Sequence, residues 1–345
     1  METTRDDENS FDDSKSINST GGRIGLGHDV LYQYQGFWSV ASFLGNIRDF
    51  QQNFKALDTD ILLASVPKSG SVWLKALAFA IVNRARYPII PPSKNHPLLT
   101  TLPHHLVPFV DFKHDYPDSS LLDFTKNRSC DSQCRLLATH VPYPSLPESI
   151  MDSAINCKVV YICRNPQDNF ISLWHFVNNI IMMCQNNIES ASPENRKTTP
   201  LLIEEAFEYF CDGVSEFGPF WDHVLGYWRE SLEKPHKVLF LRYEDLKNEP
   251  EPELKKLAEF MGYGFSVEEE SRGVIKEILS LCSFQHMKNL DVNKNGIWRN
   301  AFPNKELFRK GEVGDWKNYL TPAMVERLDR LTEEKFQGSG LSFQN

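Results

Sequence analysis

The segment ILLASVPKSGSVWLK, residues 61–75, carries the clearest structural signal in the chain. Its first four residues are apolar, as expected of a buried strand, and the residues after Gly70 have the apolar spacing of a helix. A strand, a tight turn and a helix direct backbone N–H groups and the helix N-terminus toward an anion. Gly70 lets the backbone approach that anion, Lys68 can clamp it, and the hydroxyls of Ser69 and Ser71 can donate to it. The segment therefore predicts a phosphate-binding turn similar to a P-loop, or else an ordinary helix N-cap, because the full P-loop signature is absent.

Three further segments have the character of buried strands: residues 135–139, 158–163 and 238–243 are short and apolar. Segments with helical spacing lie between or after the strands, at residues 71–84, 168–182, 203–232, 251–261 and 267–281. Strands that alternate with helices favour a parallel sheet with helices on its faces. We therefore expect a single α/β domain at residues 27–345, a parallel β-sheet flanked by helices, after a disordered acidic tail at residues 1–26.

Composition narrows the class of protein. The 345 residues include 46 Asp and Glu against 37 Lys and Arg, and this net charge of −9 argues against a general nucleic-acid binder. Seven cysteines in so long a chain do not form a disulfide framework, which favours a reducing compartment. No apolar stretch is long enough to cross a membrane, and the acidic N-terminus is not a secretory signal. We expect a cytoplasmic protein that binds neither nucleic acid nor membrane.

Several separated motifs resemble those of one family, the cytosolic sulfotransferases. PKSGSVWLK at residues 67–75 is similar to the family's P-K-S-G-T-T-W-L-K box. YQGFW at 34–38, NHPL at 95–98 and GPFW at 218–221 resemble the plant branch, and the resemblance extends from about residue 30 to the C-terminus. It implies 3′-phosphoadenosine 5′-phosphosulfate as the sulfuryl donor and a hydroxyl of a small hydrophobic plant metabolite as acceptor, of the flavonol, hydroxyjasmonate or brassinosteroid class.

The same resemblance implies which residues hold the donor. Lys68, Ser69, Gly70, Ser71, Val72 and Trp73 would lie at the 5′-phosphosulfate, and Arg164, Ser172, Arg309, Lys310 and Gly311 at the 3′-phosphate. Tyr243 would lie beside the adenosine, and Ser283 and Phe284 where the family contacts the nucleotide. Gly314, Asp315, Trp316 and Lys317 complete the R-K-G-x-x-G-D-W-K box. The chemistry of the residues agrees, because four cations suit a donor with several negative charges and strand-end residues meet at the ligand-binding edge of an open sheet. Taken singly, a strand-end arginine is more often part of a surface ion pair.

His140 follows the predicted strand at 135–139, in Ala138-Thr139-His140-Val141-Pro142. Its position in T-H-x-P resembles that of the family's catalytic histidine, which implies a general base that removes the acceptor's proton. Lys68 would then stabilise charge on the departing phosphate, with Ser172 holding Lys68 aside beforehand, and no metal is expected. Without the resemblance, a histidine at an apolar strand end is more often a packed structural residue.

The acceptor pocket is expected to be aromatic. Candidate lining residues are Phe37, Trp38, Phe109, Tyr143, Phe176 and Phe220, with His175 as a further possibility. Residues 178–200, and in particular the polar stretch 184–200, are a candidate lid.

Three departures from the family pattern leave alternatives open. Val72 replaces the second threonine of the phosphate loop and Cys282 replaces a common threonine before Ser283, so a nucleotide- or hormone-binding pseudoenzyme is a second hypothesis. A P-loop kinase is a third, although the chain has no proper Walker signature. Pro322 replaces a valine in the family's K-x-x-x-T-V-x-x-x-E dimer motif, so we expect a monomer or a weak homodimer.

Overall fold

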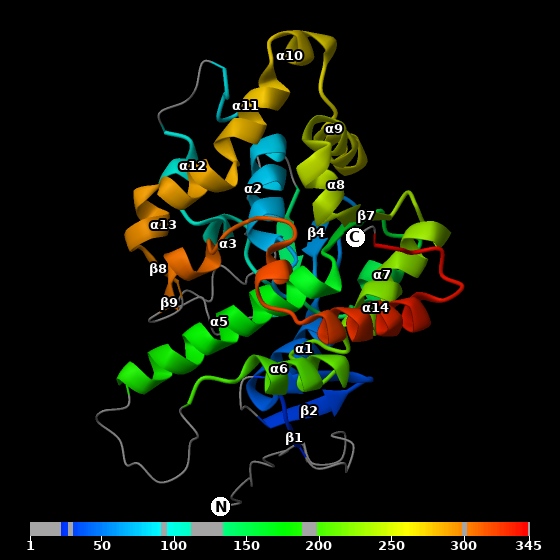
Figure 1. The fold of residues 1–345 in the computed structure, drawn as a ribbon. Helices are drawn as coiled ribbons and strands as arrows, with labels where there is room; N and C mark the ends of the chain where they lie inside the picture. The colour runs from blue at the N-terminus through cyan, green and yellow to red at the C-terminus, as the bar shows by residue number, and fades with distance from the viewer. Residues whose placement is uncertain are drawn as a thin grey trace, which may run out of the picture.

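The computed structural model describes residues 22–26, 30–90, 95–111, 134–187, 199–298 and 302–343, with the side chains of residues 184–187 also left out. At its centre lies a four-stranded parallel sheet with strand order β5-β4-β6-β7 (Figure 1). The strands are β4 (Ile61–Ala64), β5 (Leu136–Thr139), β6 (Lys158–Cys163) and β7 (Val238–Arg242). Nearly every residue of these strands is buried, as continuous apolar runs require in a parallel sheet. The predicted α/β class and all four predicted strands are confirmed.

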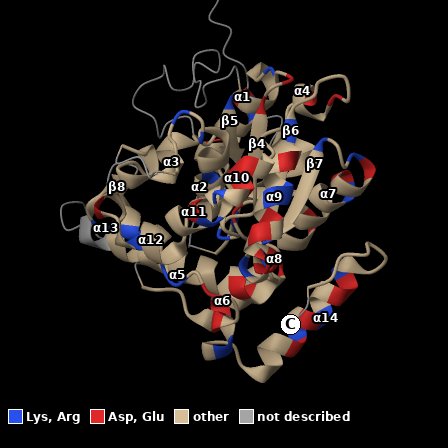
Figure 2. Cartoon of the chain, turned by 90° about the horizontal axis from the view of Figure 1, so that it is seen from above, with Lys and Arg blue, Asp and Glu red and all other residues tan. Residues whose placement is uncertain are grey.

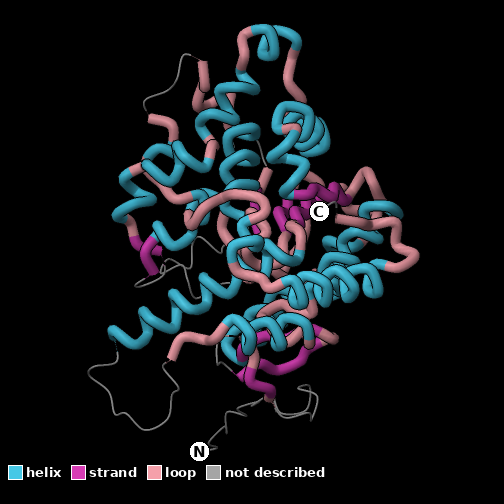
Figure 3. The backbone as a smooth tube through the Cα atoms, in the orientation of Figure 1, coloured by secondary structure: helices cyan, strands magenta, loops and turns pink. Residues whose placement is uncertain are grey.

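Helices surround this sheet (Figures 1 and 3). Those that frame the site or the core are α2 (Ser71–Val82), α5 (Pro166–Asn187), α7 (Phe220–Glu233), α8 (Tyr243–Asn248), α9 (Pro250–Met261), α12 (Phe284–Asn289) and α14 (Pro322–Phe336). The others are α1 (Ala41–Asn53), α3 (Pro103–Leu106), α4 (Glu148–Met151), α6 (Ile203–Cys211), α10 (Val267–Ser271), α11 (Val274–Leu281) and α13 (Asp291–Asn295). The apolar helix α2 is buried along most of its length and packs on α3, α9 and α11.

Two predicted helices are each divided in the structure. The segment 203–232 forms α6 and α7, and the segment 267–281 forms α10 and α11. Gly213 and Gly273 lie in the two breaks with φ angles of +76° and +78°, a backbone conformation that ends a right-handed helix.

A small antiparallel sheet precedes the domain core. It consists of β1 (Arg23–Ile24), β2 (Val30–Tyr34) and β3 (Phe37–Val40). The expected boundary of the tail at residue 26 is therefore wrong for residues 23–26, because β1 pairs with β2 and Leu26 is buried with its N–H bonded to the carbonyl of Val214. The rest of the expected tail, residues 1–21, lies outside the described residues.

The segment at 288–307, which has no regular sequence pattern, contains short elements. They are α13, β8 (Ile297–Trp298), β9 (Phe302–Pro303) and the 3-10 turn η7 (Asn304–Leu307), with residues 299–301 not described. Of the candidate lid, residues 188–198 likewise lie outside the description. None of the helices in the described ranges has the length and hydropathy needed to cross a bilayer. In Figure 2 the positions of basic and acidic residues are interspersed along the helices seen in that view.

Candidate active site

Each strand of the central sheet delivers one predicted site residue at its carboxyl end. The turn with Lys68 follows β4, His140 follows β5, Arg164 follows β6, and Tyr243 follows β7. All four line one cavity of about 540 Å³. This edge of an open parallel sheet is where α/β proteins generally bind ligands.

The turn after β4 requires glycine at residue 70. Gly70 has φ +106° and precedes α2, and a Cβ atom built there would lie 2.8 Å from Cδ2 of Tyr243. The left-handed conformation and the close ring both exclude a larger residue. The backbone of this turn, together with the side chain of Ser71, is therefore left facing the cavity.

Ser69 differs from its predicted role. Its side chain is fully buried, is not among the lining residues, and accepts a hydrogen bond of 3.0 Å from Nδ2 of Asn169. The same Asn169 amide donates to the carbonyl of Pro67 at 2.9 Å. Ser69 therefore stabilises the turn on the side away from the cavity, and Ser71 is the serine whose hydroxyl can donate to an anion in the cavity.

Lys68 is held in a strongly cationic setting. Burial, and then the charges of Arg309 and Arg164, lower its pKa from 10.5 to about 7. Its Nζ lies 3.9 Å from the ring centroid of Phe176, and it makes no hydrogen bond with Ser172 among the described residues. An anion in the cavity would relieve this repulsion, which is what a phosphate site needs.

The two arginines are oriented by their neighbours. Arg164 donates to the carbonyl of Glu312 at 2.5 Å and lies 3.7 Å from Asp168. Arg309 donates to Asp315 at 2.6 Å, and Lys310 donates to the same carboxylate at 2.5 Å. The Nε–H groups of Arg164 and Arg309 are buried without a hydrogen-bond partner among the described residues, as expected where an anionic group is to be bound.

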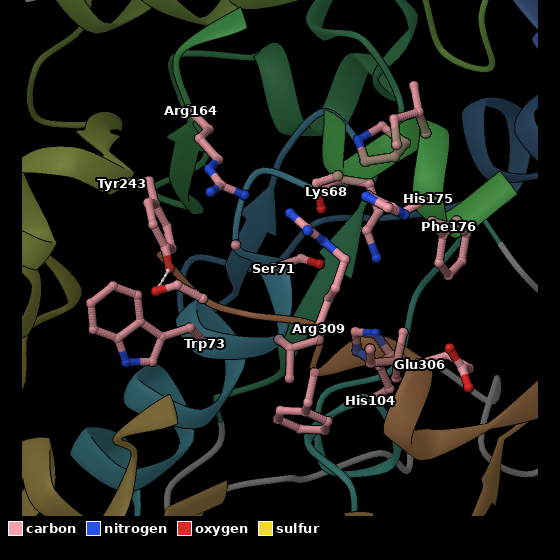
Figure 4. Close-up of a pocket in the computed structure, with 18 of the residues that line it drawn as sticks. Lys68, Ser71, Trp73, His104, Arg164, His175, Phe176, Tyr243, Glu306 and Arg309 are labelled. Carbon is pink, nitrogen blue, oxygen red and sulfur yellow. Dashed lines mark hydrogen bonds between the residues drawn. The ribbon is translucent and has the colours of Figure 1, made fainter. Parts of the chain in front are cut away.

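Hydrogen bonds from Asp168 and Tyr243 hold the segment that contains Arg309 over the cavity. Asp168 accepts hydrogen bonds from the backbone of Gly314 at 2.7 Å and Trp316 at 3.2 Å. On the other side, the hydroxyl of Tyr243 donates to the carbonyl of Gly311 at 3.0 Å (Figure 4). A Cβ at Gly311 would lie 2.4 Å from Phe284, so this glycine allows the segment to approach α12.

An aromatic compartment lies at one end of the cavity. The rings of Trp73 and Tyr243 meet edge to face with centroids 5.4 Å apart, and Ser283 and Phe284 line the same cavity. Lys247, one helical turn after Tyr243, lies 5.9 Å from the Trp73 ring and was not predicted. Its spacing of four residues from Tyr243 on α8 is the signal that would have identified it. Cys282 is fully buried and is not among the lining residues, so it does not alter this compartment.

Hydrogen bonds fix the orientation and tautomer of His140. Its Nδ1 lies 2.7 Å from the carbonyl of Ser65, which can only accept, so Nδ1 carries the proton. Nε2 then carries the lone pair of the neutral ring, as a general base requires. The backbone N–H of His140 donates to Asp111 at 3.0 Å, and burial raises the pKa of Asp111 to about 6.

His223 also holds His140, a role that the sequence analysis did not identify. Nε2 of His223 lies 2.9 Å from the carbonyl of His140, and its Nδ1 lies 3.0 Å from the hydroxyl of Tyr161. Complete burial lowers the pKa of His223 to about 4, so it is neutral at pH 7. Next to it, Tyr227 donates to the carbonyl of Val141 at 2.6 Å.

The aromatic lining of the cavity near His140, where the acceptor is expected, was only partly predicted. Phe109, His175 and Phe176 do line it. Four candidates do not: Phe37, Trp38, Tyr143 and Phe220. Phe220 and Tyr143 are buried in the core, where Tyr143 packs on Tyr227. The aromatic and histidine side chains that line the cavity and were missed are Phe43, His104, Phe217, Trp298, Phe302 and Phe308, the last of which lies 6.3 Å from the Phe284 ring, centroid to centroid.

The fold and the cluster of cations define an α/β protein in which a strand–turn–helix and a histidine border one cation-rich cavity. The chain belongs to the sulfotransferase family, because residues 58–340 match the family's sulfotransferase domain. Cytosolic sulfotransferase 15 of Arabidopsis thaliana is 49% identical over 317 residues, which cover 91% of this chain and 82% of that protein. Cytosolic sulfotransferase 14 of the same plant is 45% identical over 97% of this chain and 91% of its own.

Solved structures agree with this assignment. A crystal structure of an Arabidopsis thaliana protein assigned as a steroid sulphotransferase is 38% identical, with a TM-score of 0.71 and coverage of 99% of both chains. Mouse sulfotransferase SULT7A1, complexed with PAP, is 25% identical with a TM-score of 0.62, over 90% of this chain and 95% of the mouse chain. The predicted family is confirmed.

Proposed function

We propose that this chain transfers a sulfuryl group from 3′-phosphoadenosine 5′-phosphosulfate to a hydroxyl of a small hydrophobic plant metabolite in the cytoplasm. The observation that carries the proposal is that Lys68, Arg164, Arg309 and His140 converge on one cavity from separate parts of the chain. The relatives named cytosolic sulfotransferases and the PAP complex of a related enzyme support the location and the donor.

The donor would be held by the residues whose geometry suits it. The Lys68 turn and Ser71 fit the 5′-phosphosulfate; Arg164, Arg309 and the Gly311 segment fit the 3′-phosphate; and Trp73 and Tyr243 fit the nucleoside. Ser172 lines the cavity on the same helix as Phe176 and is kept as a 3′-phosphate candidate. When bound, the donor supplies an activated sulfuryl group.

The chain's own residues would then carry out the proton and charge steps. His140 accepts the proton of the acceptor hydroxyl at Nε2, while Ser65 keeps Nδ1 protonated and the ring oriented. Lys68, in its charged form, stabilises the negative charge that develops on the leaving phosphate oxygen. The charge stabilisation is assigned to side chains without a metal, and among the described residues no three His, Cys, Asp or Glu side chains group as metal ligands.

The quaternary state is proposed as monomer or weak homodimer. Pro322 stands in the first turn of α14, where Thr321 caps the helix by accepting from Met324 N–H at 3.3 Å. Proline is favourable in the first turn of a helix, so Pro322 in place of valine stabilises the start of α14.

The test is sulfate transfer from donor labelled with ³⁵S to a panel of flavonols, hydroxyjasmonates and brassinosteroids. We expect turnover by the parent, and a fall in kcat of about 10²–10⁴-fold in His140→Ala with PAP affinity retained. Turnover unchanged in His140→Ala would remove the assignment of the base. PAP binding without turnover on the whole panel would favour a pseudoenzyme, and phosphorylated product from ATP would favour a kinase.

A further inference from the structure

A short segment extends the central sheet beyond β5. Phe109 forms a parallel bridge with Ala138 of β5. The N–H of Ala138 donates to the carbonyl of Pro108 at 2.9 Å, and the carbonyl of Ala138 accepts from the N–H of Val110 at 2.9 Å. Residues 108–110 therefore lie beside β5, the first strand in the sheet order, as one more parallel strand.

The hydrogen-bond ladder between this segment and β5 ends at His140 with a side chain. In a parallel pair the bonded residues of one strand are two apart, so the next N–H after that of Ala138 is that of His140. Its regular acceptor would be the carbonyl of Val110. The carboxylate of Asp111 accepts this bond instead, with Oδ2 3.0 Å from the backbone nitrogen of His140. Asp111 is fully buried, so water does not compete for the bond.

His140 is held at three points, each by a different segment. The carbonyl of Ser65 fixes its ring at 2.7 Å, His223 fixes its backbone carbonyl at 2.9 Å, and Asp111 fixes its backbone N–H. The segment of Asp111 also carries Phe109, which lines the cavity with its ring 4.7 Å from the imidazole, centroid to centroid. Asp111 therefore fixes the proposed base relative to an aromatic wall of the cavity.

We infer that Asp111 is a positioning residue for His140, and that its carboxylate places the imidazole against the acceptor by holding the backbone N–H. This inference rests on the proposed function, in which His140 is the base. Asp111 is not among the lining residues, so it acts through His140 and not by contact with the donor or the acceptor. Because a displacement of about 1 Å can lower a rate by about 10²-fold, loss of this bond should lower kcat.

Two variants, Asp111→Ala and Asp111→Asn, separate the hydrogen bond from the charge. Both remove the negative charge, on which the charge of Lys75 acts, but only asparagine keeps an oxygen acceptor for the N–H of His140. We expect kcat for sulfate transfer to fall at least tenfold in Asp111→Ala and to stay within threefold of the parent in Asp111→Asn. The Kd of PAP, measured by calorimetry, should be unchanged in both. An unchanged kcat in Asp111→Ala, or an equal fall in both variants, would overturn the inference.

The matched control is Asp152→Ala. The carboxylate of Asp152 also accepts from a backbone N–H, that of Ala154 at 2.9 Å, but it does not line the cavity. This variant should leave kcat unchanged. If Asp111→Ala does not fold, Asp111→Val, which likewise has no acceptor, replaces it.

Hydrogen exchange of the His140 amide tests the bond without relying on turnover. Its rate is compared with that of the Val159 amide on β6, which donates to the carbonyl of Lys237 at 2.8 Å, so that a general loss of stability acts on both. The ratio of the His140 rate to the Val159 rate should rise at least tenfold in Asp111→Ala and stay at the parent value in Asp111→Asn. If the parent transfers no sulfate, the proposed function fails and this ratio alone decides the inference. A ratio in Asp111→Ala equal to that of the parent would then overturn it.

Discussion

Replacing Lys68 by methionine should stabilise the ligand-free protein while damaging its donor site. The fall of the Lys68 pKa from 10.5 to about 7 means that the folded protein holds this charge at an energetic disadvantage. At about 1.36 kcal/mol per pKa unit, this corresponds to at most about 5 kcal/mol. Because Lys68 is half-buried and partly screened by water, we expect Lys68→Met to raise the free energy of unfolding by about 2 kcal/mol at pH 6.

The gain in stability should depend on pH in a defined direction. The folded-state pKa lies below the unfolded value, so the unfolded chain binds more protons between pH 7 and 10.5. The parent is therefore penalised fully below pH 7, and the penalty disappears as pH rises toward 10.5. The advantage of Lys68→Met should be largest at pH 6 and smaller at pH 9.

Urea unfolding at pH 6 and pH 9 measures this difference, with Lys276→Met, an exposed position on α11, as the matched control. Addition of PAP at about 100 times its Kd should raise the parent's stability by about 2.7 kcal/mol and that of Lys68→Met by less. A Lys68→Met protein that is less stable than the parent at pH 6, or whose advantage grows toward pH 9, would refute the reasoning.

Three other variants test separate parts of the site. Gly70→Ala should weaken PAP binding more than tenfold by calorimetry, because the added Cβ would lie 2.8 Å from Tyr243. The matched control is Gly262→Ala, since Gly262 also has a positive φ, +83°, but has open space around it; this variant should leave PAP affinity intact. Val72→Thr should tighten PAP binding by about tenfold or more if its hydroxyl reaches the 5′-phosphate, because a hydrogen bond to a charged group contributes about 1.5–3 kcal/mol. Unchanged affinity would show that this hydroxyl makes no such bond. His223→Phe removes the hydrogen-bond partner of the His140 carbonyl and of the Tyr161 hydroxyl. This should lower the free energy of unfolding by about 2–5 kcal/mol and reduce kcat more than it changes KM. An unchanged kcat would show that His223 does not position His140.

The parts of the fold that could be predicted are those that local sequence determines. The strand at β4 follows from a continuous apolar run, and the turn after it follows from Gly70 between a strand and a helix. The position of His140 could be predicted because a residue directly after a parallel strand lies at the ligand-binding edge of the sheet.

The parts that could not be predicted depend on contacts between distant segments. Whether Ser69 or Ser71 faces the cavity is decided by Asn169 on α5, one hundred residues further along the chain. The aromatic lining comes largely from segments outside the long helices, such as those with Phe217 and Trp298, whose side-chain directions have no sequence period. His223 has the helical spacing of any core residue, and only its contacts with Tyr161 and His140 reveal its role.

The hydrogen bond between Ser65 and His140 has a consequence for how this enzyme could diverge. Ser65 leads into the Lys68 turn, and its N–H also bonds to the carbonyl of Thr139, so the pairing of β4 with β5 sets the separation of Lys68 and His140. Lining side chains such as Trp298 and Phe302 come from other segments, which form neither of these hydrogen bonds, so a change there leaves both bonds in place. Gene duplicates of such a protein can therefore acquire new substrate ranges while inheriting an unaltered reaction centre.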